Sequence, residues 1–297
     1  MKDIQRRYGS VVILVLLLAS YIVNTLFVLL TLDNLYDFGS FIASGQFANE
    51  GQDPYSADSP LILAVRFPEI HHSGIAPNLN PPISVLVFQT IAGLHPMKAI
   101  MVWRVITVTL FILSVALLAR QYPRERTTAL LRLAWALNLA GLWHTIQLGQ
   151  IYTFALLMAV AAWLALKKSK PILGGIFLGI LIAIKPNFVF WALLLGIVGN
   201  WAAFLSAGIT AASISAIPLI FRGFNIYNEW LQASRSYTPD LLVFPGNNSL
   251  QGLMAHFGVS QIGVILSIVL AIGILVFGFR QKPGSEAANS LGIVTSL

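Results

Sequence analysis

Apolar stretches of about 20 residues recur along almost the whole chain, and no other feature of the sequence constrains its fold as strongly. An α-helix of that length crosses roughly 30 Å of hydrocarbon, so each stretch is long enough to span a membrane. Only 10% of the 297 residues are charged, against roughly 25% in soluble domains. The alternating segments of about 10 residues that mark a transmembrane β-barrel are absent from the sequence. The chain is therefore predicted to be an all-α polytopic membrane protein, a helical bundle that forms a single domain over residues 1–297.

We expect about eight spans from the positions of these stretches. They are predicted at residues 10–32, 98–119, 128–147, 151–166, 171–185, 187–200, 201–221 and 261–279. The first exceeds the roughly 7–15 apolar residues of a signal peptide, which favours a retained anchor. The segment 171–200 could instead form one span with a buried lysine. A further apolar run at 82–95 is too short for a span, so we predict a re-entrant or interfacial helix that follows the proline pair of NLNPPISVLVF.

The orientation follows from lysine and arginine, which favour cytoplasmic loops. Four basic clusters occur in the chain: residues 2–7, 120–126, 167–170 and 280–282. If all four face the cytoplasm, the outer side holds two large loops and two tight turns: 33–97, 222–260, Gly149-Gln150 and Lys185-Pro186. The net charge of +7 is then explained by membrane topology, and we expect no nucleic-acid partner.

Asp37 is the first candidate for chemistry, in the stretch NLYDFGSFIASG. A carboxylate just beyond a span is most often a solvated cap. The segment 36–48, however, is predicted to be an amphipathic helix in the membrane interface. Four apolar side chains are expected to rest on the lipid: Phe38, Phe41, Ile42 and Phe47. Such a helix would hold Asp37 where a substrate has one end in lipid and the other in water, so we expect Asp37 to be catalytic.

Lys185 and two other polar residues near the outer turns are candidates for substrate binding. The Lys185 ammonium could snorkel to the interface or bind an anion such as phosphate in an outer cavity. Arg104 could likewise snorkel or bind a lipid phosphate. Gln150, in the turn LGQIY, could bind a sugar hydroxyl or remain solvated.

Three further candidates are His144, His256 and Asn248. Each histidine could serve as an acid–base or phosphate-binding group, although a lone histidine is more often structural. Asn248 lies in GNNSLQGL, which we expect to be a polar turn before a helix that Asn248 or Ser249 caps. The sequence contains no cysteine, no phosphate-binding glycine loop, no HExxH and no DxD pair in the first outer loop, so we expect neither a metal nor a cofactor.

Several weak motifs follow one another in a fixed order. They are Asp37, Pro81-Pro82, Gly149-Gln150, Lys185-Pro186 and Asn248-Ser249. Over residues 33–256 this order resembles glycosyltransferase family 87, the polyprenol-phosphate-mannose-dependent alpha-mannosyltransferase-like proteins of the C superfamily of glycosyltransferases. The resemblance implies a multi-span fold with its active site on the non-cytoplasmic face. It also implies a lipid-linked sugar donor, an inverting transfer that requires no metal, and a catalytic base at Asp37.

The chain departs from the family pattern at two places. Tyr152 stands where an asparagine usually follows the Gly-Gln turn, which bears on the sugar contact there. One span follows the second outer loop, fewer than the family usually has, and the final LGIVTSL predicts a further apolar segment beyond residue 297.

We therefore expect a hexosyltransferase in a bacterial or archaeal plasma membrane, with an outward-facing active site. It would move a hexose, expected to be mannose, from a polyprenyl-phosphate donor to a lipid or glycan acceptor, with membrane lipids around it. Two alternatives remain open at this point: a lipid or polyprenyl transporter, and a non-catalytic subunit of an envelope-glycan assembly complex. A transporter predicts inverted repeats, and none is evident in the sequence.

Overall fold

The structure is a computed structural model that describes most of the chain: residues 2–31, 34–70, 77–121, 126–244, 247, 249–281 and 285–296. Helices make up 80% of it, and the described residues form no strand. The predicted all-helical architecture is therefore confirmed.

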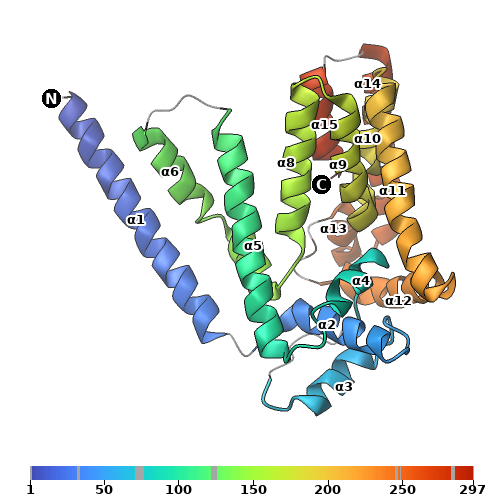
Figure 1. Ribbon diagram of the computed structural model, residues 1–297. Helices are drawn as coiled ribbons and strands as arrows, with labels where there is room; N and C mark the ends of the chain where they lie inside the picture. The colour runs from blue at the N-terminus through green and yellow to red at the C-terminus, as the bar shows by residue number, and fades with distance from the viewer. Residues whose placement is uncertain are drawn as a thin grey trace.

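Two groups of helices diverge from a common end of the molecule (Figure 1). The first group contains α1 (Lys2–Leu30), α5 (Pro96–Ala119), α6 (Arg126–Ala136) and α7 (Ala140–Leu148). The second contains α8 (Tyr152–Lys167), α9 (Pro171–Ile184), α10 (Val189–Ile197), α11 (Trp201–Arg222), α14 (Ser260–Gln281) and α15 (Ser285–Ser296). Contacts between α5 and α8 join the two groups.

A further set of helices closes the end where the two groups meet, at the bottom of Figure 1. They are α2 (Tyr36–Asn49), α3 (Ser59–Arg66), α4 (Ile83–Gln89), α12 (Asn225–Leu242) and α13 (Leu250–His256). We call this the α2 end. The opposite end carries Arg120, Lys167, Lys168, Lys170 and Arg280, and we call it the basic end. Described members of three basic clusters thus lie at one end, as the charge pattern predicts.

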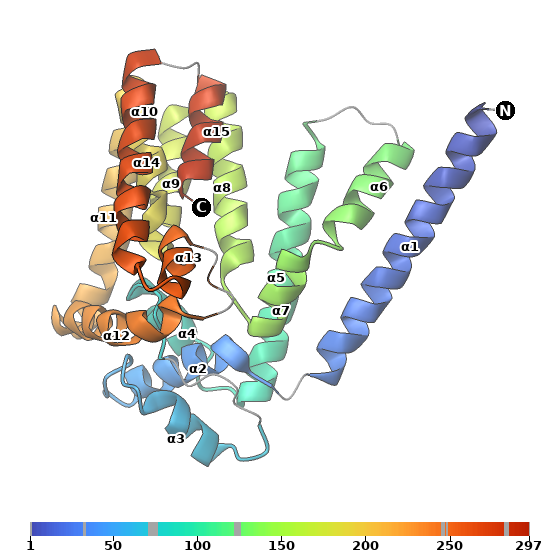
Figure 2. The same ribbon diagram turned by 180° about the vertical axis from the view of Figure 1, so that it is seen from behind.

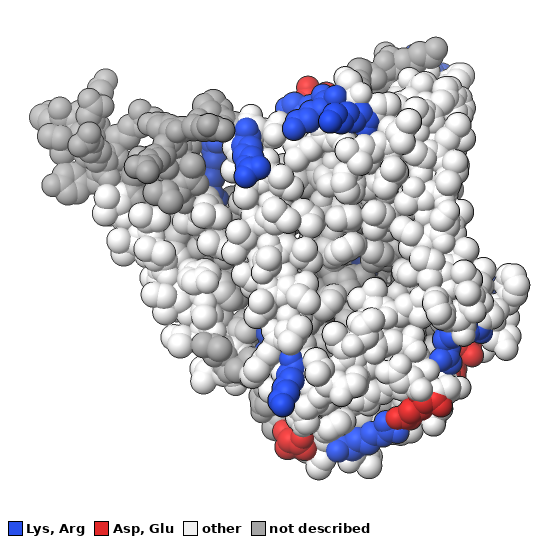
Figure 3. Space-filling model, viewed as in Figure 1, with Lys and Arg blue, Asp and Glu red and all other residues white. Residues whose placement is uncertain are grey.

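On one face of the molecule, the exposed charged side chains avoid the middle. Figure 3 shows them gathered at the two ends of the visible face, with a largely uncharged band between. Charges are expensive in hydrocarbon, so this distribution suits a protein whose middle lies in a membrane.

Within the part of the chain that the structure describes, four helices are long and apolar enough to cross a membrane: Val11–Val28, Pro96–Ala119, Trp201–Arg222 and Ser260–Arg280. They correspond to predicted spans 10–32, 98–119, 201–221 and 261–279. Three other predicted spans form shorter apolar helices: Tyr152–Lys167, Pro171–Ile184 and Pro186–Ile197. Since Lys185 separates the last two, residues 171–200 are not one continuous helix.

The segment predicted as a span at 128–147 is not one continuous helix, because the structure divides it into α6 and α7. Asn138 lies at the break, and its Nδ2 donates to the carbonyl oxygens of Leu17 (3.0 Å) and Ala134 (2.7 Å). The Leu137 carbonyl accepts a bond of 2.8 Å from the indole nitrogen of Trp143. The bonds to the Ala134 and Leu137 carbonyls satisfy backbone groups that the break would otherwise leave unpaired in an apolar setting.

The run at 82–95 contains only the seven-residue helix α4, which lies at the α2 end. At about 1.5 Å per residue, such a helix covers roughly 10 Å, far less than the hydrocarbon thickness. The prediction that this run does not cross the membrane is consistent with this length.

The prediction that α2 rests on lipid through its aromatic side chains is wrong. Phe38, Phe41, Ile42 and Phe47 are all at most 5% exposed and pack inside the protein. Small residues explain this, because a Cβ at Gly45 would lie only 2.8 Å from the Phe88 backbone of α4. The helix is therefore enclosed by the protein on nearly all sides.

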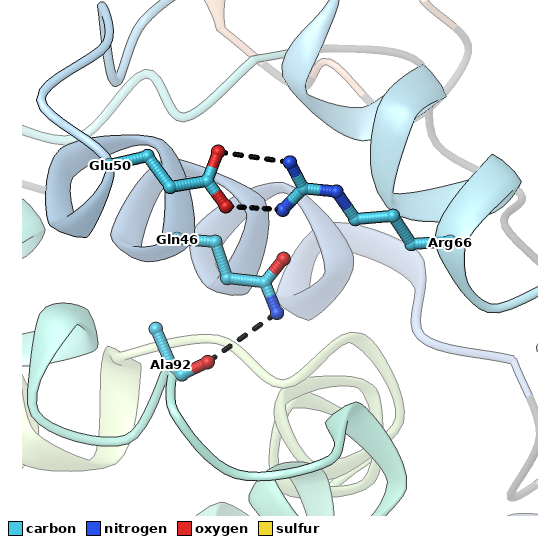
Figure 4. Close-up of polar contacts among 4 residues, drawn as sticks. All are labelled: Gln46, Glu50, Arg66 and Ala92. Carbon is cyan, nitrogen blue, oxygen red and sulfur yellow. Dashed lines mark hydrogen bonds and ion pairs between the residues drawn. The ribbon is translucent and has the colours of Figure 1, made fainter.

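Polar contacts hold the far end of α2, as Figure 4 shows. The Arg66 guanidinium of α3 donates two hydrogen bonds to the Glu50 carboxylate, at 2.5 and 2.9 Å. Gln46 donates to the carbonyl of Ala92 at 3.4 Å. These contacts fix α2 against α3 and the turn that leads into α5.

Candidate active site

An apolar cavity of about 650 Å³ lies between the two groups of helices. Its walls come from α5, α7, α8, the 3-10 turn Pro186–Phe188 and α15, which Figure 2 shows beside α8. The lining is mainly hydrophobic, and its polar members are Thr145, Tyr152, Thr153, Lys185 and Asn187. A cavity of this kind suits a ligand that is mostly hydrocarbon with one polar end.

Lys185 is the charged residue among those lining the cavity. Pro186 follows it directly and cannot continue the hydrogen-bond pattern of α9, so the helix ends there. The ammonium donates to Oδ1 of Asn80 at 3.3 Å and lies 4.7 Å from the ring centroid of Tyr152. Tyr152 therefore gives Lys185 a cation–π contact.

The turn after α7 brings Gln150 to α2. Gly149 has φ of +71°, and a Cβ there would lie 2.5 Å from Cβ of Phe38. Only glycine allows this approach in this backbone conformation. Gln150, the next residue, donates a hydrogen bond from Nε2 to Oδ2 of Asp37.

Two residues of α5 support this turn from the opposite side. The indole nitrogen of Trp103 donates to the Gly149 carbonyl at 2.8 Å. Arg104 donates from Nε to the Ile146 carbonyl at 3.3 Å, within the last turn of α7, where cations are favourable. Its two terminal nitrogens are buried without a partner among the described residues. Arg104 is not among the residues that line the cavity, so its contacts favour support of the turn.

The backbone in front of Asp37 is also constrained. Tyr36 has φ of +41°, which is uncommon for a bulky residue and costs on the order of 1–3 kcal/mol. Its hydroxyl accepts a bond of 3.3 Å from Gln147, and its backbone N–H donates to Asn34 at 3.2 Å. Gln147 and Gln150 therefore hold two successive residues at the start of α2.

Burial has the largest effect on the acidity of Asp37. Partial desolvation raises the pKa of its carboxyl group, while the Gln150 hydrogen bond and the charge of Lys185 lower it. The net effect is a raised pKa. A carboxylate in this environment is a better proton acceptor than one in water, and it lies close enough to Lys185 for the two charges to interact.

Asn78 and Asn80, which the sequence reasoning did not single out, form a buried polar network beneath Lys185. Asn78 is 0% and Asn80 8% exposed. The sequence feature that could have pointed to them is the pair of asparagines directly before two prolines, in NLNPP. Buried amides need hydrogen-bond partners, and two of the partners here, Ser44 and Lys185, lie far away in the sequence.

The remaining candidates lie elsewhere. His144 on α7 and His256 on α13 are exposed, and neither lines the cavity. Asn248 falls outside the described residues. Ser249 caps α13, as expected, by accepting a 3.0 Å bond from the backbone of Gly252. The described part of the chain contains no group of three histidine or acidic side chains suited to a metal ion.

The family model of glycosyltransferase family 87 matches residues 78–297. The chain belongs to glycosyltransferase family 87. This family indicates a membrane glycosyltransferase. The searches of curated proteins and of solved structures gave no match.

The matched segment contains Asn78, Asn80, Gln150 and Lys185, so most of the site lies within the family's region of the chain. Asp37 and all of α2 precede it. The place of Asp37 in the site therefore rests on its contact with Gln150 and its electrostatic interaction with Lys185.

Proposed function

We propose that this glycosyltransferase moves a hexose, mannose in the first instance, from a polyprenyl-phosphate donor to a lipid or glycan acceptor. The observation that carries the proposal is that the Asp37 carboxylate lies close enough to the Lys185 ammonium for their charges to interact, and that Lys185 lines an apolar cavity. The cavity suits the first part of a polyprenyl chain, Lys185 suits its phosphate, and Asp37 suits the acceptor hydroxyl.

The reaction needs one proton acceptor and one cation. The acceptor oxygen attacks the anomeric carbon while its proton passes to Asp37. The bond between that carbon and the phosphate oxygen breaks, and the polyprenyl phosphate leaves with one more negative charge. Attack on the face opposite the phosphate inverts the anomeric configuration. Base assistance typically contributes about 10²–10⁴-fold to such a rate, and the ammonium of Lys185 stabilises the charge that develops on the phosphate.

We further propose a C-superfamily architecture with the α2 end on the non-cytoplasmic side of a bacterial or archaeal plasma membrane. The location of Arg120, Lys167 and Arg280 at the basic end supports this orientation, because basic residues favour the cytoplasmic side. The donor, the acceptor and the sugar would then meet at the outer membrane surface.

A transfer assay tests the proposal. Purified protein in lipid nanodiscs is incubated with radiolabelled polyprenyl-phosphate mannose and a membrane-lipid extract as acceptor, and labelled product is separated by chromatography. We expect transfer that depends on both protein and donor. Donor that crosses the bilayer of sealed vesicles without sugar transfer would support a transporter instead. If the protein neither transfers nor moves the donor, it is a non-catalytic subunit.

A further inference from the structure

The segment NLN, residues 78–80, connects α2 and α4 to Lys185 through buried hydrogen bonds. Nδ2 of Asn78 donates to the hydroxyls of Ser44 on α2 (3.3 Å) and Ser84 on α4 (3.1 Å). Oδ1 of Asn78 accepts from the backbone N–H (3.0 Å) and from Nδ2 (3.2 Å) of Asn80. Oδ1 of Asn80 then accepts from the ammonium of Lys185 at 3.3 Å.

The backbone of the same segment is held from two sides. The indole nitrogen of Trp230 donates to the Leu79 carbonyl at 3.0 Å. The Tyr55 hydroxyl donates to the Asn80 carbonyl at 2.9 Å. The network therefore rests on α2, α4, α12 and the loop before α3, and it presents Asn80 to Lys185 on a rigid support.

The direction of both amides follows from one backbone group. The N–H of Asn80 can only donate, so the Asn78 atom beside it must be the oxygen. The NH₂ of Asn78 then faces the two serines. The Asn80 atom beside the Asn78 oxygen must be NH₂, which leaves its oxygen for Lys185. A neutral amide acceptor therefore holds the ammonium.

The direct contacts of Lys185 in the described part of the chain are with neutral groups, although its charge also interacts at longer range with that of Asp37. These neutral groups are the Asn80 amide and the π face of Tyr152, and no ion pair recorded there involves Lys185. A carboxylate at the position of Asn80 would fix the side chain equally well, but it would cancel most of its charge. The amide fixes the ammonium and leaves its charge for a ligand.

We propose that Asn80 is a positioning residue that orients Lys185 toward the phosphate of the lipid donor without neutralising it, with Asn78 as its support. This inference rests on the proposed function, because it assigns the free charge to the donor phosphate. It makes the amide, rather than an acid, a requirement for donor affinity at this position.

Two substitutions separate charge from structure. Asn80→Asp keeps the size and the oxygen that faces Lys185, but it adds a negative charge. Asn80→Ala removes the tether and leaves the charge of Lys185 uncancelled. A hydrogen bond between two charged groups is typically stronger than one with a neutral partner, so the new aspartate should hold the Lys185 ammonium and neutralise it. We therefore expect Asn80→Asp to bind radiolabelled polyprenyl phosphate about 10- to 100-fold more weakly than the wild type. Asn80→Ala should weaken it only about three- to tenfold, the cost of losing orientation alone.

The control is Asn49→Asp, the same change of charge at an exposed site on α2. It should bind polyprenyl phosphate as the wild type does. All proteins are measured in nanodiscs, with the thermal unfolding midpoint recorded for each. If Asn80→Asp is too unstable to purify, Asn78→Asp takes its place, and Asn80→Ser takes the place of Asn80→Ala. Asn78→Asp also adds a negative charge to the network, but on the residue behind Asn80 rather than in contact with Lys185.

The order of affinities decides the inference. If the wild type binds polyprenyl phosphate most tightly, Asn80→Ala less tightly and Asn80→Asp least tightly, the result supports Asn80 as a neutral hydrogen-bond partner that orients Lys185. An alanine variant as weak as the aspartate variant would indicate a purely structural asparagine, and unchanged affinity in both would remove Asn80 from donor binding; either result overturns the inference while sugar transfer by the wild type still stands. A wild-type protein that neither binds polyprenyl phosphate nor transfers sugar overturns the proposed function and this inference together.

Discussion

Gln150 donates a hydrogen bond to the carboxylate of Asp37 across a separation of 113 residues. The bond joins the start of α2 to the turn between α7 and α8. It exists because Gly149 permits the turn to approach Phe38 closely and because Trp103 fixes the Gly149 carbonyl. The carboxylate is thus held by a neutral donor, just as Lys185 is held by a neutral acceptor.

The first prediction concerns Asp37. Asp37→Asn keeps the shape of the side chain and removes its ability to accept a proton, so the turnover number should fall by about 10²-fold or more. Binding of the donor should be retained, because the proposed function assigns Asp37 to the acceptor hydroxyl and not to the donor. Transfer kinetics and binding of radiolabelled polyprenyl phosphate measure the two effects. Asp58→Asn, an exposed acid beside α3, is the matched control and should keep full activity. Unchanged turnover in Asp37→Asn would remove this residue as the base.

The second prediction is a shift in pH dependence. The base must be deprotonated, so activity falls on the acid side as pH drops through the raised pKa of Asp37. The Gln150 hydrogen bond lowers that pKa. Gln150→Ala should therefore move the acid limb of the kcat/KM profile to higher pH. Gln147→Ala removes a hydrogen bond to Tyr36 rather than to Asp37, so it should leave the limb in place. Equal shifts in both variants would mean that the effect is a general loosening of α2.

The third prediction concerns Lys185. If its ammonium binds the donor phosphate, Lys185→Ala should raise the donor KM about 10- to 100-fold, because it removes a charge-assisted bond. Lys185→Arg keeps a cation and should recover part of that loss, although its planar group fits the Asn80 oxygen differently. Lys98→Ala, an exposed lysine near the start of α5, serves as the control. A Lys185→Ala enzyme with an unchanged donor KM would mean that the ammonium does not bind the phosphate.

The sequence predicts the class of fold, and for physical reasons it also singles out three residues that the structure places close together. Long apolar runs and few charges require a membrane protein, and Pro186 and Gly149 mark turns regardless of tertiary contacts. Lys185 and Gln150 stand out because polar groups are costly near hydrocarbon. The structure places three residues that the sequence singles out, Asp37, Gln150 and Lys185, in one region.

Tertiary packing decides the features that the sequence did not predict. The aromatic residues of α2 suggest a lipid-facing surface, but Gly45 admits the α4 backbone and the aromatic face is buried instead. The sequence predicts one span at 128–147, and the contacts of Asn138 and Trp143 account for the break within it. The role of Asn80 depends on a lysine 105 residues away. Local pattern carries no information about such pairings.

The last prediction tests how α9 carries Lys185. Gly175 and Gly179 of α9 pack against the backbone of α11, the small-residue contact that brings membrane helices close together. A Cβ at Gly179 would lie 2.6 Å from the Ala207 carbonyl oxygen and 3.0 Å from the Ala211 nitrogen. Because these are backbone atoms, they cannot move aside as a side chain would.

Gly179→Val should therefore push α9 away from α11 and cost about 1–3 kcal/mol of stability. It should also weaken donor binding, because Lys185 follows the last residue of α9. Gly208→Val, on the same pair of helices but with nothing within 4 Å of its Cβ, is the matched control. Thermal unfolding in nanodiscs and binding of radiolabelled polyprenyl phosphate measure both effects. If Gly179→Val and Gly208→Val unfold at the same midpoint, the close contact between α9 and α11 does not determine the stability of this bundle.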